Sequence, residues 1–309
     1  MKRLEIYDMP ESEAKTINRI HLYGIAVICI LITTIAMYSA SIDLIKDWLR
    51  FSEGYGHGLI IFLLFIYLLH NEFKGITYLP YHFSYAATAC FFIFMLCVTL
   101  VNLTGIMLLQ QIFIPLIFAM SFITIAGRHI APRIILPTIL LFFAIPLWDY
   151  LTYSLISLTV SNVTLMLSPF SFPFLMDGNS VKLPSGEITI AASCSGLRYF
   201  VIAMALSFLM ISICQLRWQL KLGFFILAIV LALLANAVRV WALILIGYYS
   251  DMQNALIDDH ENFGWFVFML FMLPLYVIFH HLEIKKPAIY ALTGKPVSAS
   301  SNITKNIIV

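Results

Sequence analysis

Apolar residues recur in long uninterrupted runs along most of this chain, and polar or turn-forming residues separate one run from the next. A helix needs about 20 apolar residues to cross a bilayer, so runs of this length are typical of transmembrane helices. We therefore expect an all-α polytopic membrane protein. The pattern predicts about eight membrane spans, over residues 20–40, 57–70, 83–102, 105–126, 132–148, 197–214, 219–246 and 263–282.

A ninth apolar stretch, residues 150–169, has a different pattern. Hydroxyl residues recur in it at spacings of three and four, which aligns them on one face of a helix, while leucines form another face. Such a helix suits the membrane interface better than a lipid-facing span. The hydroxyl residues are Ser154, Ser157, Ser161, Thr164 and Ser168, and the leucines are Leu151, Leu155, Leu158 and Leu165.

The distribution of basic residues supports an interfacial position for residues 150–169. Lysine and arginine favour cytoplasmic loops. With eight spans, thirteen of the 18 Lys and Arg residues lie inside, whereas a ninth span would turn Arg217, Lys221 and the basic tail outward. We therefore predict a cytoplasmic leader over residues 1–19, one membrane domain over residues 20–282 and a cytoplasmic basic tail over residues 283–309. The first apolar run is interpreted as a retained anchor, because it is long enough to span.

The loop at residues 171–193 then lies on the outer face. Its segment "SVKLPSGEITIA" alternates apolar and polar residues on both sides of a Pro-Ser-Gly turn signal. This alternation predicts a short β-hairpin that leads the chain to Cys194.

Composition narrows the functional classes. Of the 309 residues, 61% are hydrophobic and 11% are charged, which excludes a soluble globular protein. The sequence contains no patch typical of nucleic-acid binding, so membrane lipids are expected partners and nucleic acid is not. The metalloprotease alternative lacks support, because His260-Glu261 is not followed by the second histidine of an H-E-x-x-H site. We expect neither a metal nor a cofactor.

The predicted topology brings three reactive side chains to the outer boundary. Cys194 begins the sixth span, Arg239 lies about 27 Å along a helix from Lys221, and His260 precedes the eighth span. A helix N-terminus and a nearby cation favour the thiolate form of a cysteine, which attacks carbonyl groups. Histidine exchanges protons near neutral pH, with Asp258, Asp259 or Glu261 available to orient the ring. A buried arginine suits an oxyanion or a substrate carboxylate.

Each of these residues also has a structural interpretation. A cysteine at a helix start is more often a small apolar filler than a nucleophile, and Arg198 has the reach to snorkel to the headgroups. His57 either lines the same cavity or caps a turn, and Ser195 is better explained as a capping residue than as a serine nucleophile. A transporter, or a protein that handles lipid-linked glycans, would bind an anion with these arginines without covalent chemistry. A Cys194–Cys214 disulfide is excluded by about 30 Å of intervening helix.

Three motifs resemble one known family. "CSGLR" opens a span, "NAVRVW" covers residues 236–241 and "HENFGWFVF" covers residues 260–268, with a "GHG" segment near the second span. In this order they resemble the exosortase family, close to its exosortase A branch, over most of residues 50–275. Family members often have glycine before the arginine motif, where this chain has Ala237 and Val238.

The resemblance implies a cysteine transpeptidase or protease of the bacterial inner membrane, with its active site on the periplasmic face. Its substrates would be PEP-CTERM proteins, which end in a Pro-Glu-Pro motif, a transmembrane helix and a basic tail, in an exopolysaccharide-export context. Carried over residue by residue, the catalytic set is Cys194, Arg239 and His260. Arg198, His57 and Asp259 are the candidate substrate-binding residues, and Arg198 would pair with the acidic residue of the motif.

Overall fold

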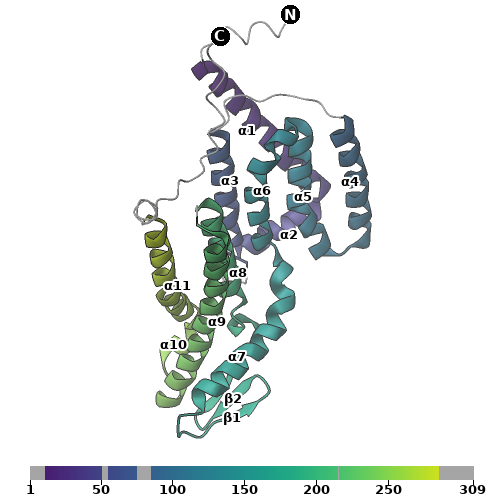
Figure 1. Ribbon diagram of the computed structural model, residues 1–309. Coiled ribbons are helices and arrows are strands. Elements are labelled where there is room, and N and C mark those ends of the chain that lie inside the picture. Colours follow the sequence, from purple (N-terminus) through teal and green to yellow (C-terminus); the bar gives the residue numbers. More distant parts are fainter. Residues whose placement is uncertain (1–10, 51–54, 75–84, 215, 285–309) are drawn as a thin grey trace, which may run out of the picture.

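The computed structural model describes residues 11–50, 55–74, 85–214 and 216–284. Residues 1–10 of the predicted leader and residues 285–309 of the predicted tail lie outside the described residues, as do the loop segments 51–54 and 75–84 and residue 215. The described chain is mostly helical, with one small β-sheet at one end (Figure 1).

The N-terminal half is a helical bundle held together by aromatic and branched aliphatic side chains. Helix α1 packs on α5, α3 packs on α6, and α4 packs on α5. The core between them includes Phe65, Phe118 and Phe122, each at most 3% exposed. These elements are α1 (Glu11–Ala36), α2 (Tyr38–Leu49), α3 (Gly58–Lys74), α4 (Tyr85–Thr104), α5 (Met107–Ala126), η1 (Arg128–Ile130) and α6 (Ala131–Leu141).

Two predicted spans differ from the observed helices. The first ends early, because Met37 leaves the helical conformation and α2 turns away from α1 by 104°. The segment 132–148 is not one helix either. Helix α6 ends at Leu141 and two short 3₁₀ helices follow, η2 (Phe142–Ala144) and η3 (Pro146–Leu151). Between them Ile145 is extended, as expected for a residue that precedes proline.

The C-terminal half is organised around one long helix, α9 (Trp218–Tyr249), which contacts α7, α8 and α11. Alanines at 228 and 232 are fully buried where these helices meet, which allows close approach of their backbones. The other elements are α7 (Thr152–Leu167), η4 (Ala192–Cys194), α8 (Leu197–Ile213), α10 (Ala255–Asp258) and α11 (His260–Ile284).

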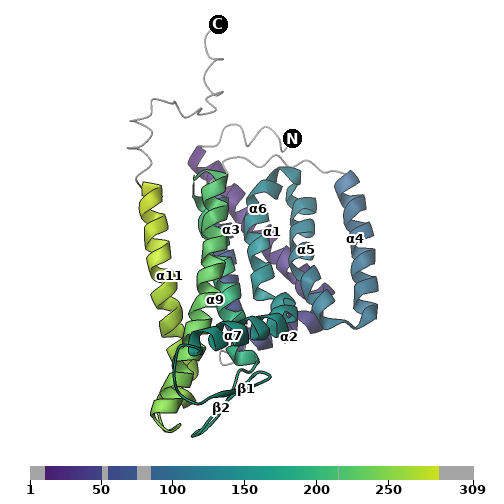
Figure 2. The same ribbon diagram turned by 60° about the horizontal axis from the view of Figure 1, so that its bottom comes forward.

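Helix α7 lies across the direction of α5, α9 and α11 in Figure 2. Its buried face consists of Leu155, Thr159, Val163 and Leu167, at the spacing of four that one helix face requires. Of the four leucines predicted to share a face, Leu155 is buried, whereas Leu151, Leu158 and Leu165 are exposed. The buried face of α7 packs on α9, so contact with that helix, and not leucine content, decides which face is covered.

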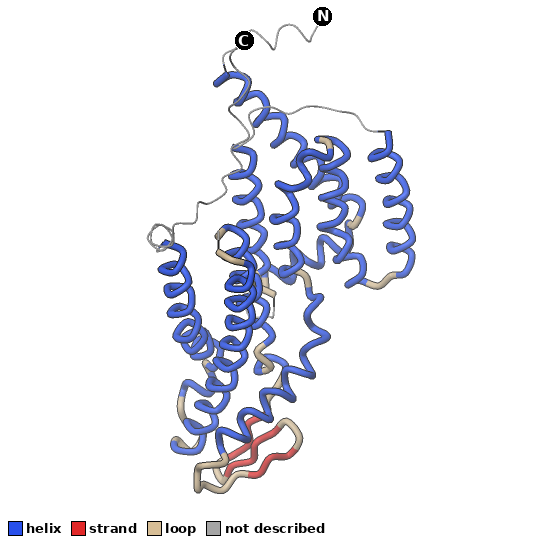
Figure 3. The backbone as a smooth tube through the Cα atoms, viewed as in Figure 1, coloured by secondary structure: helices blue, strands red, loops and turns tan. Residues whose placement is uncertain are grey.

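The segment between α7 and η4 forms a three-stranded antiparallel sheet of β1 (Leu175–Asp177), β2 (Ser180–Leu183) and β3 (Gly186–Thr189) (Figure 3). Strands β2 and β3 pair around Pro184 and Ser185, with Val181 opposite Ile188. The sheet covers an apolar cluster with α7 and α9, in which Val181 and Ile190 are fully buried. From β3 the chain runs directly into η4.

Long helices with outward apolar side chains identify a multi-pass membrane protein. Within the described residues, six helices are long and apolar enough to cross a bilayer, or seven if the bent pair α1 and α2 is one span. Helix α4 exposes Phe92, Ile93 and Leu96 by more than 60%, which suits lipid and not water. The six candidate spans include Pro146–Leu167, which contains the segment that the sequence pattern places at the interface. They do not include α3, which has 17 residues, or α6, which has 11, although both lie in predicted spans.

Candidate active site

Cys194 lies in a tight turn between the sheet and α8. It is the last residue of η4, and α8 begins three residues later at Leu197. Gly196 has a φ of +84°, a conformation that residues with a Cβ rarely adopt. The Ser195 hydroxyl accepts a hydrogen bond from the Leu197 N–H at 3.2 Å, which agrees with its predicted role at the helix start. The cysteine is therefore presented by a turn and not by the first turn of the helix.

Arg239 reaches this turn from α9. Its side chain is only 2% exposed, and its Nη2 lies 3.9 Å from the Cys194 Sγ. Nη1 donates to the Ser193 carbonyl at 3.5 Å. The guanidinium also lies over the Tyr199 ring, 5.6 Å from its centroid, which adds a cation–π contact. A buried cation thus sits directly beside the thiol.

The start of α11 closes against this arginine. A Cβ added to Gly264 would lie 2.0 Å from the Tyr199 hydroxyl and 2.8 Å from the Arg239 Nε. No side chain larger than hydrogen fits there without moving one of them. Gly264 therefore allows α11 to approach the guanidinium.

His260 is the first residue of α11, one turn before Gly264 and on nearly the same helix face. Its Nδ1 is 3.1 Å from the Ile257 carbonyl, which accepts hydrogen bonds only, so Nδ1 carries a proton and donates it. The other ring nitrogen, Nε2, is left to exchange protons. The backbone thus orients the ring, a role that the sequence analysis gave to a neighbouring carboxylate.

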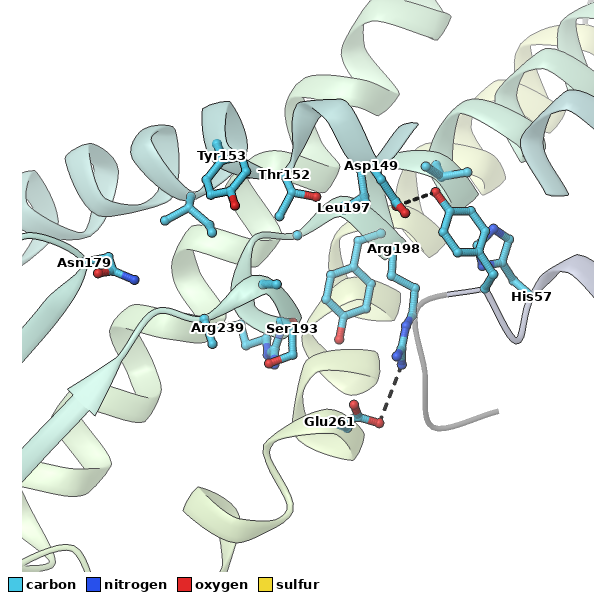
Figure 4. A pocket seen from close by; sticks show the side chains of 17 residues that line it. His57, Asp149, Thr152, Tyr153, Asn179, Ser193, Leu197, Arg198, Arg239 and Glu261 are labelled. Atoms are coloured by element: carbon cyan, nitrogen blue, oxygen red, sulfur yellow. Dashed lines mark hydrogen bonds and ion pairs between the residues drawn. The ribbon is translucent and has the colours of Figure 1, made fainter. Parts of the chain in front are cut away.

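A cavity of about 750 Å³ opens beside the turn. Ser193, Gly196 and Arg239 line it together with residues of η3 and α7, and Figure 4 labels Ser193 and Arg239 near Thr152 and Tyr153. The Cys194 side chain is half-buried and packs partly against the apolar cluster around Val240, so its neighbours line the cavity and the thiol flanks it. The volume suits a short peptide segment.

One charged pair lies on the cavity wall. Arg198 Nη1 and Glu261 Oε2 are 3.6 Å apart, and the Arg198 side chain is 19% exposed (Figure 4). Arg198 comes from the first turn of α8 and Glu261 from the first turn of α11. The pair therefore joins the two helices that begin at the cavity.

The far wall is polar as well. The Tyr55 hydroxyl donates to Asp149 Oδ1 at 2.8 Å, and His57 Nε2 lies 3.2 Å from the Phe143 carbonyl. Burial and the neighbouring Asp149 carboxylate raise the pKa of the Tyr55 phenol above its ordinary value, so the phenol keeps the proton that it donates. His57 is 8% exposed and lines the cavity.

The structure brings four of the six predicted site residues together. Cys194 and Arg239 are in contact, and Arg239, Arg198 and His57 line one cavity. Cys194 and His260 are not among the residues that line this cavity. Asp259 is exposed and accepts two hydrogen bonds from Asn262, at 2.9 and 3.0 Å, and it is not among the residues that line the cavity. All five cysteines are free, including the pair for which a disulfide was excluded.

Sequence reasoning missed several polar residues of the site. Asn236 lies one turn before Arg239 on α9, is 1% exposed and donates to the Cys194 carbonyl at 2.9 Å. An asparagine inside a strongly apolar helix was the available signal, because buried polar side chains in membrane helices are costly without a partner. The Tyr55–Asp149 bond joins residues 94 positions apart, and no local pattern predicts it.

Comparison with known proteins agrees with the motifs. The sequence model of the family described as Transmembrane exosortase matches residues 48–277, which is more than half of the chain. No curated protein and no solved structure matches the chain, so the assignment rests on this family and on the site geometry. The match includes the Cys194 turn, the Arg239 helix and the start of α11. This chain belongs to the transmembrane exosortase family.

Proposed function

We propose that the protein is a membrane-embedded cysteine protease or transpeptidase that cleaves PEP-CTERM sorting signals of exported proteins. The observation that carries the proposal is the 3.9 Å contact between the Cys194 sulfur and the buried Arg239 guanidinium beside a peptide-sized cavity. A buried arginine needs a compensating anion, and a thiolate or an oxyanion supplies one. Family membership supports the same chemistry.

The proposed reaction is acyl transfer through a thioester. The Cys194 thiolate attacks the carbonyl carbon of the scissile peptide bond, and Arg239 stabilises the oxygen as it becomes negative. The Nε2 of His260 first takes the proton of the Cys194 thiol, and it gives that proton to the leaving amine when the carbon–nitrogen bond breaks. Water or an amine then attacks the thioester, the carbon–sulfur bond breaks, and Nε2 takes the proton of the attacking group. Cys194 is thereby released as thiolate and His260 is protonated again for the next cycle.

We further propose that Arg198 binds the acidic residue of the sorting motif. Its cavity position and its pairing with Glu261 support this role, because a guanidinium that already binds one carboxylate can exchange it for another. Arg198→Gln should then raise KM for a Pro-Glu-Pro substrate and leave KM for a Pro-Gln-Pro substrate unchanged. Equal effects on both substrates would contradict this role.

We also propose the membrane placement that this function needs. The chain would cross the bacterial inner membrane eight times, with α7 at the interface and the Cys194 turn on the periplasmic side. The crosswise direction of α7 and the predominance of basic residues in the predicted cytoplasmic loops support it. The sorting signal would then meet the thiol after export, in the expected exopolysaccharide-export context.

The test is processing of a co-expressed membrane protein that carries a Pro-Glu-Pro tail. Cys194→Ala should lower cleavage by about a thousand-fold or more, the order expected when a nucleophile is removed. Arg239→Lys should lower it by about 100-fold, as for loss of an oxyanion donor, and His260→Ala should slow it by about 100-fold. Each variant is compared at matched membrane abundance.

Cys214→Ala is the matched control. Cys214 directly follows α8 at the end opposite Cys194 and is 4% exposed, so the substitution removes a thiol without touching the cavity. Cleavage should then persist. Cleavage that survives Cys194→Ala would contradict the nucleophile assignment, and no cleavage even by wild type would favour another substrate or the transporter alternative.

A further inference from the structure

Asn236 connects the thiol turn to the arginine. It lies one turn before Arg239 on α9 and is 1% exposed. Its Nδ2 donates to the Cys194 carbonyl at 2.9 Å, and its Oδ1 accepts from the Arg239 Nη1 at 3.3 Å. One buried amide therefore touches the backbone of the proposed nucleophile and the side chain of its proposed partner.

A second contact fixes the amide itself. Asn236 Nδ2 also donates to the Thr159 hydroxyl at 3.2 Å, and that hydroxyl donates to the Ser195 carbonyl at 3.4 Å. Thr159 is 4% exposed on the buried face of α7. Two consecutive carbonyls of the turn, those of Cys194 and Ser195, are thus held from two different helices.

The turn also packs directly on this amide. A Cβ added to Gly196 would lie 2.7 Å from the Asn236 Cγ, closer than two carbon atoms approach. Asn236 therefore both bonds the turn and defines how near it comes to α9. A side chain that only filled space would not donate two hydrogen bonds and accept a third, as Asn236 does.

We propose that Asn236 is a positioning residue, which sets the Cys194 thiol against the Arg239 guanidinium and is itself held by Thr159. This inference rests on the proposed function for its catalytic consequence. Reacting groups that are displaced by about 1 Å lose about 100-fold in rate, so small movements of this turn matter. The sulfur belongs to the turn before α8, and the guanidinium belongs to α9. Asn236 bonds both the Cys194 carbonyl and the Arg239 Nη1, so it connects the two groups directly.

The Asn236 amide donates through its nitrogen and accepts through its oxygen, so a substitution can remove one of these functions and keep the other. Asn236→Asp keeps an oxygen for Arg239 but replaces the donor that faces the Cys194 carbonyl. Both Asn236→Asp and Asn236→Ala should lower kcat for a Pro-Glu-Pro peptide about 10-fold or more, with KM within about three-fold of wild type. A fold defect alone would lower the amount of active enzyme and leave the remaining kinetics unchanged.

Thr159 provides a matched pair of variants that disturb the fold less. Thr159→Ser keeps the hydroxyl and should retain kcat, whereas Thr159→Val removes it and should lower kcat in the same direction as Asn236→Ala. Thr164→Val is the control on the same helix, because that hydroxyl donates only to the Val160 carbonyl of its own helix, at 2.8 Å. If Asn236→Ala does not accumulate in the membrane, the Thr159 pair carries the test.

The deciding measurement does not need catalysis. N-ethylmaleimide alkylation of Cys194 is followed by peptide mass spectrometry in the full-length chain across pH. Arg239→Gln removes the guanidinium that lies 3.9 Å from the sulfur, and it gives the reference change in this profile. We expect Asn236→Ala and Thr159→Val to change the profile in the same direction as Arg239→Gln, and Thr164→Val to leave it unchanged.

Two results would distinguish the proposed peptidase function from the positioning role of Asn236. If wild type cleaves no peptide but Asn236→Ala changes the alkylation profile as Arg239→Gln does, the proposed function fails and the positioning role stands. If the alkylation profile and kcat of both Asn236 variants equal those of wild type, the positioning role is overturned whether or not the protein is a peptidase.

Discussion

At the scale of single residues, this site depends on two glycines as well as on its polar side chains. Gly196 packs against Asn236 and Gly264 packs against Arg239, and an added Cβ at either glycine would lie 2.8 Å or less from that neighbour. The two glycines therefore let α8 and α11 approach a buried guanidinium. Close approach excludes lipid and water, which strengthens each polar contact within the site.

Gly264→Ala should reduce activity while a matched glycine substitution does not. The new Cβ forces Tyr199 or Arg239 to move, so we expect about a 10- to 100-fold loss of kcat and a destabilisation of about 1–3 kcal/mol. Gly223→Ala is the control, because this glycine of α9 has no atom within 4 Å of the added Cβ. Equal activity of the two variants would show that the contact does not matter.

At the scale of elements, α7 determines where the sheet and the thiol turn lie. Its buried stripe packs on α9, its Thr159 bonds the turn, and the sheet follows it in the chain. By length α7 and η3 together are able to span, yet Figure 2 shows α7 crosswise to its neighbours. The direction of this one element decides on which side the sheet emerges.

A cysteine-accessibility experiment tests that direction. In a chain without its native cysteines, Glu187→Cys on exposed strand β3 should react with a membrane-impermeant maleimide in intact spheroplasts. Arg128→Cys in η1 should react only after permeabilisation, because we place it in the cytoplasm. The opposite labelling of Glu187→Cys would mean that α7 spans the membrane and would separate the proposed site from exported substrates.

At the scale of the whole molecule, the cavity joins the two halves of the chain. Its lining comes from the segment before α3, from η3 and α7, from the Cys194 turn, and from α9 and α11. The Tyr55–Asp149 bond links the first two of these segments. Loss of this bond should therefore weaken the joint between the halves without touching the thiol.

Tyr55→Phe tests this joint. Losing one hydrogen bond to a partly buried carboxylate should cost about 1–2 kcal/mol and lower the midpoint of thermal unfolding by a few degrees. The raised pKa of Tyr55 means that its bond is fully present below the unfolded-state pKa of about 10 and is lost only as pH rises further. The difference from wild type should thus stay constant from neutral pH to about pH 9, whereas burial raises the pKa of the accepting Asp149 carboxyl, so acid pH lies outside this comparison. Tyr150→Phe, at a residue 76% exposed, is the control and should change nothing.

The sequence by itself determined that this is a multi-span helical protein, that strands precede Cys194, and which motifs mark the family. Hydropathy runs, alternation and motif order are local properties, and the bilayer enforces helices wherever they are apolar. It also singled out Cys194 and Arg239, because a polar residue at the end of an apolar run is conspicuous, and the structure places these two side chains in contact.

Only the tertiary structure decided the contacts. The bend at Met37, the break at Ile145, the buried face of α7 and the bonds of Asn236 and Tyr55 depend on how separate helices meet. Such contacts join residues tens of positions apart, and each is fixed by the shape and polarity of its partner surface. No pattern along one segment contains that information, which is why the sequence predicted the elements and the family more fully than the contacts between helices.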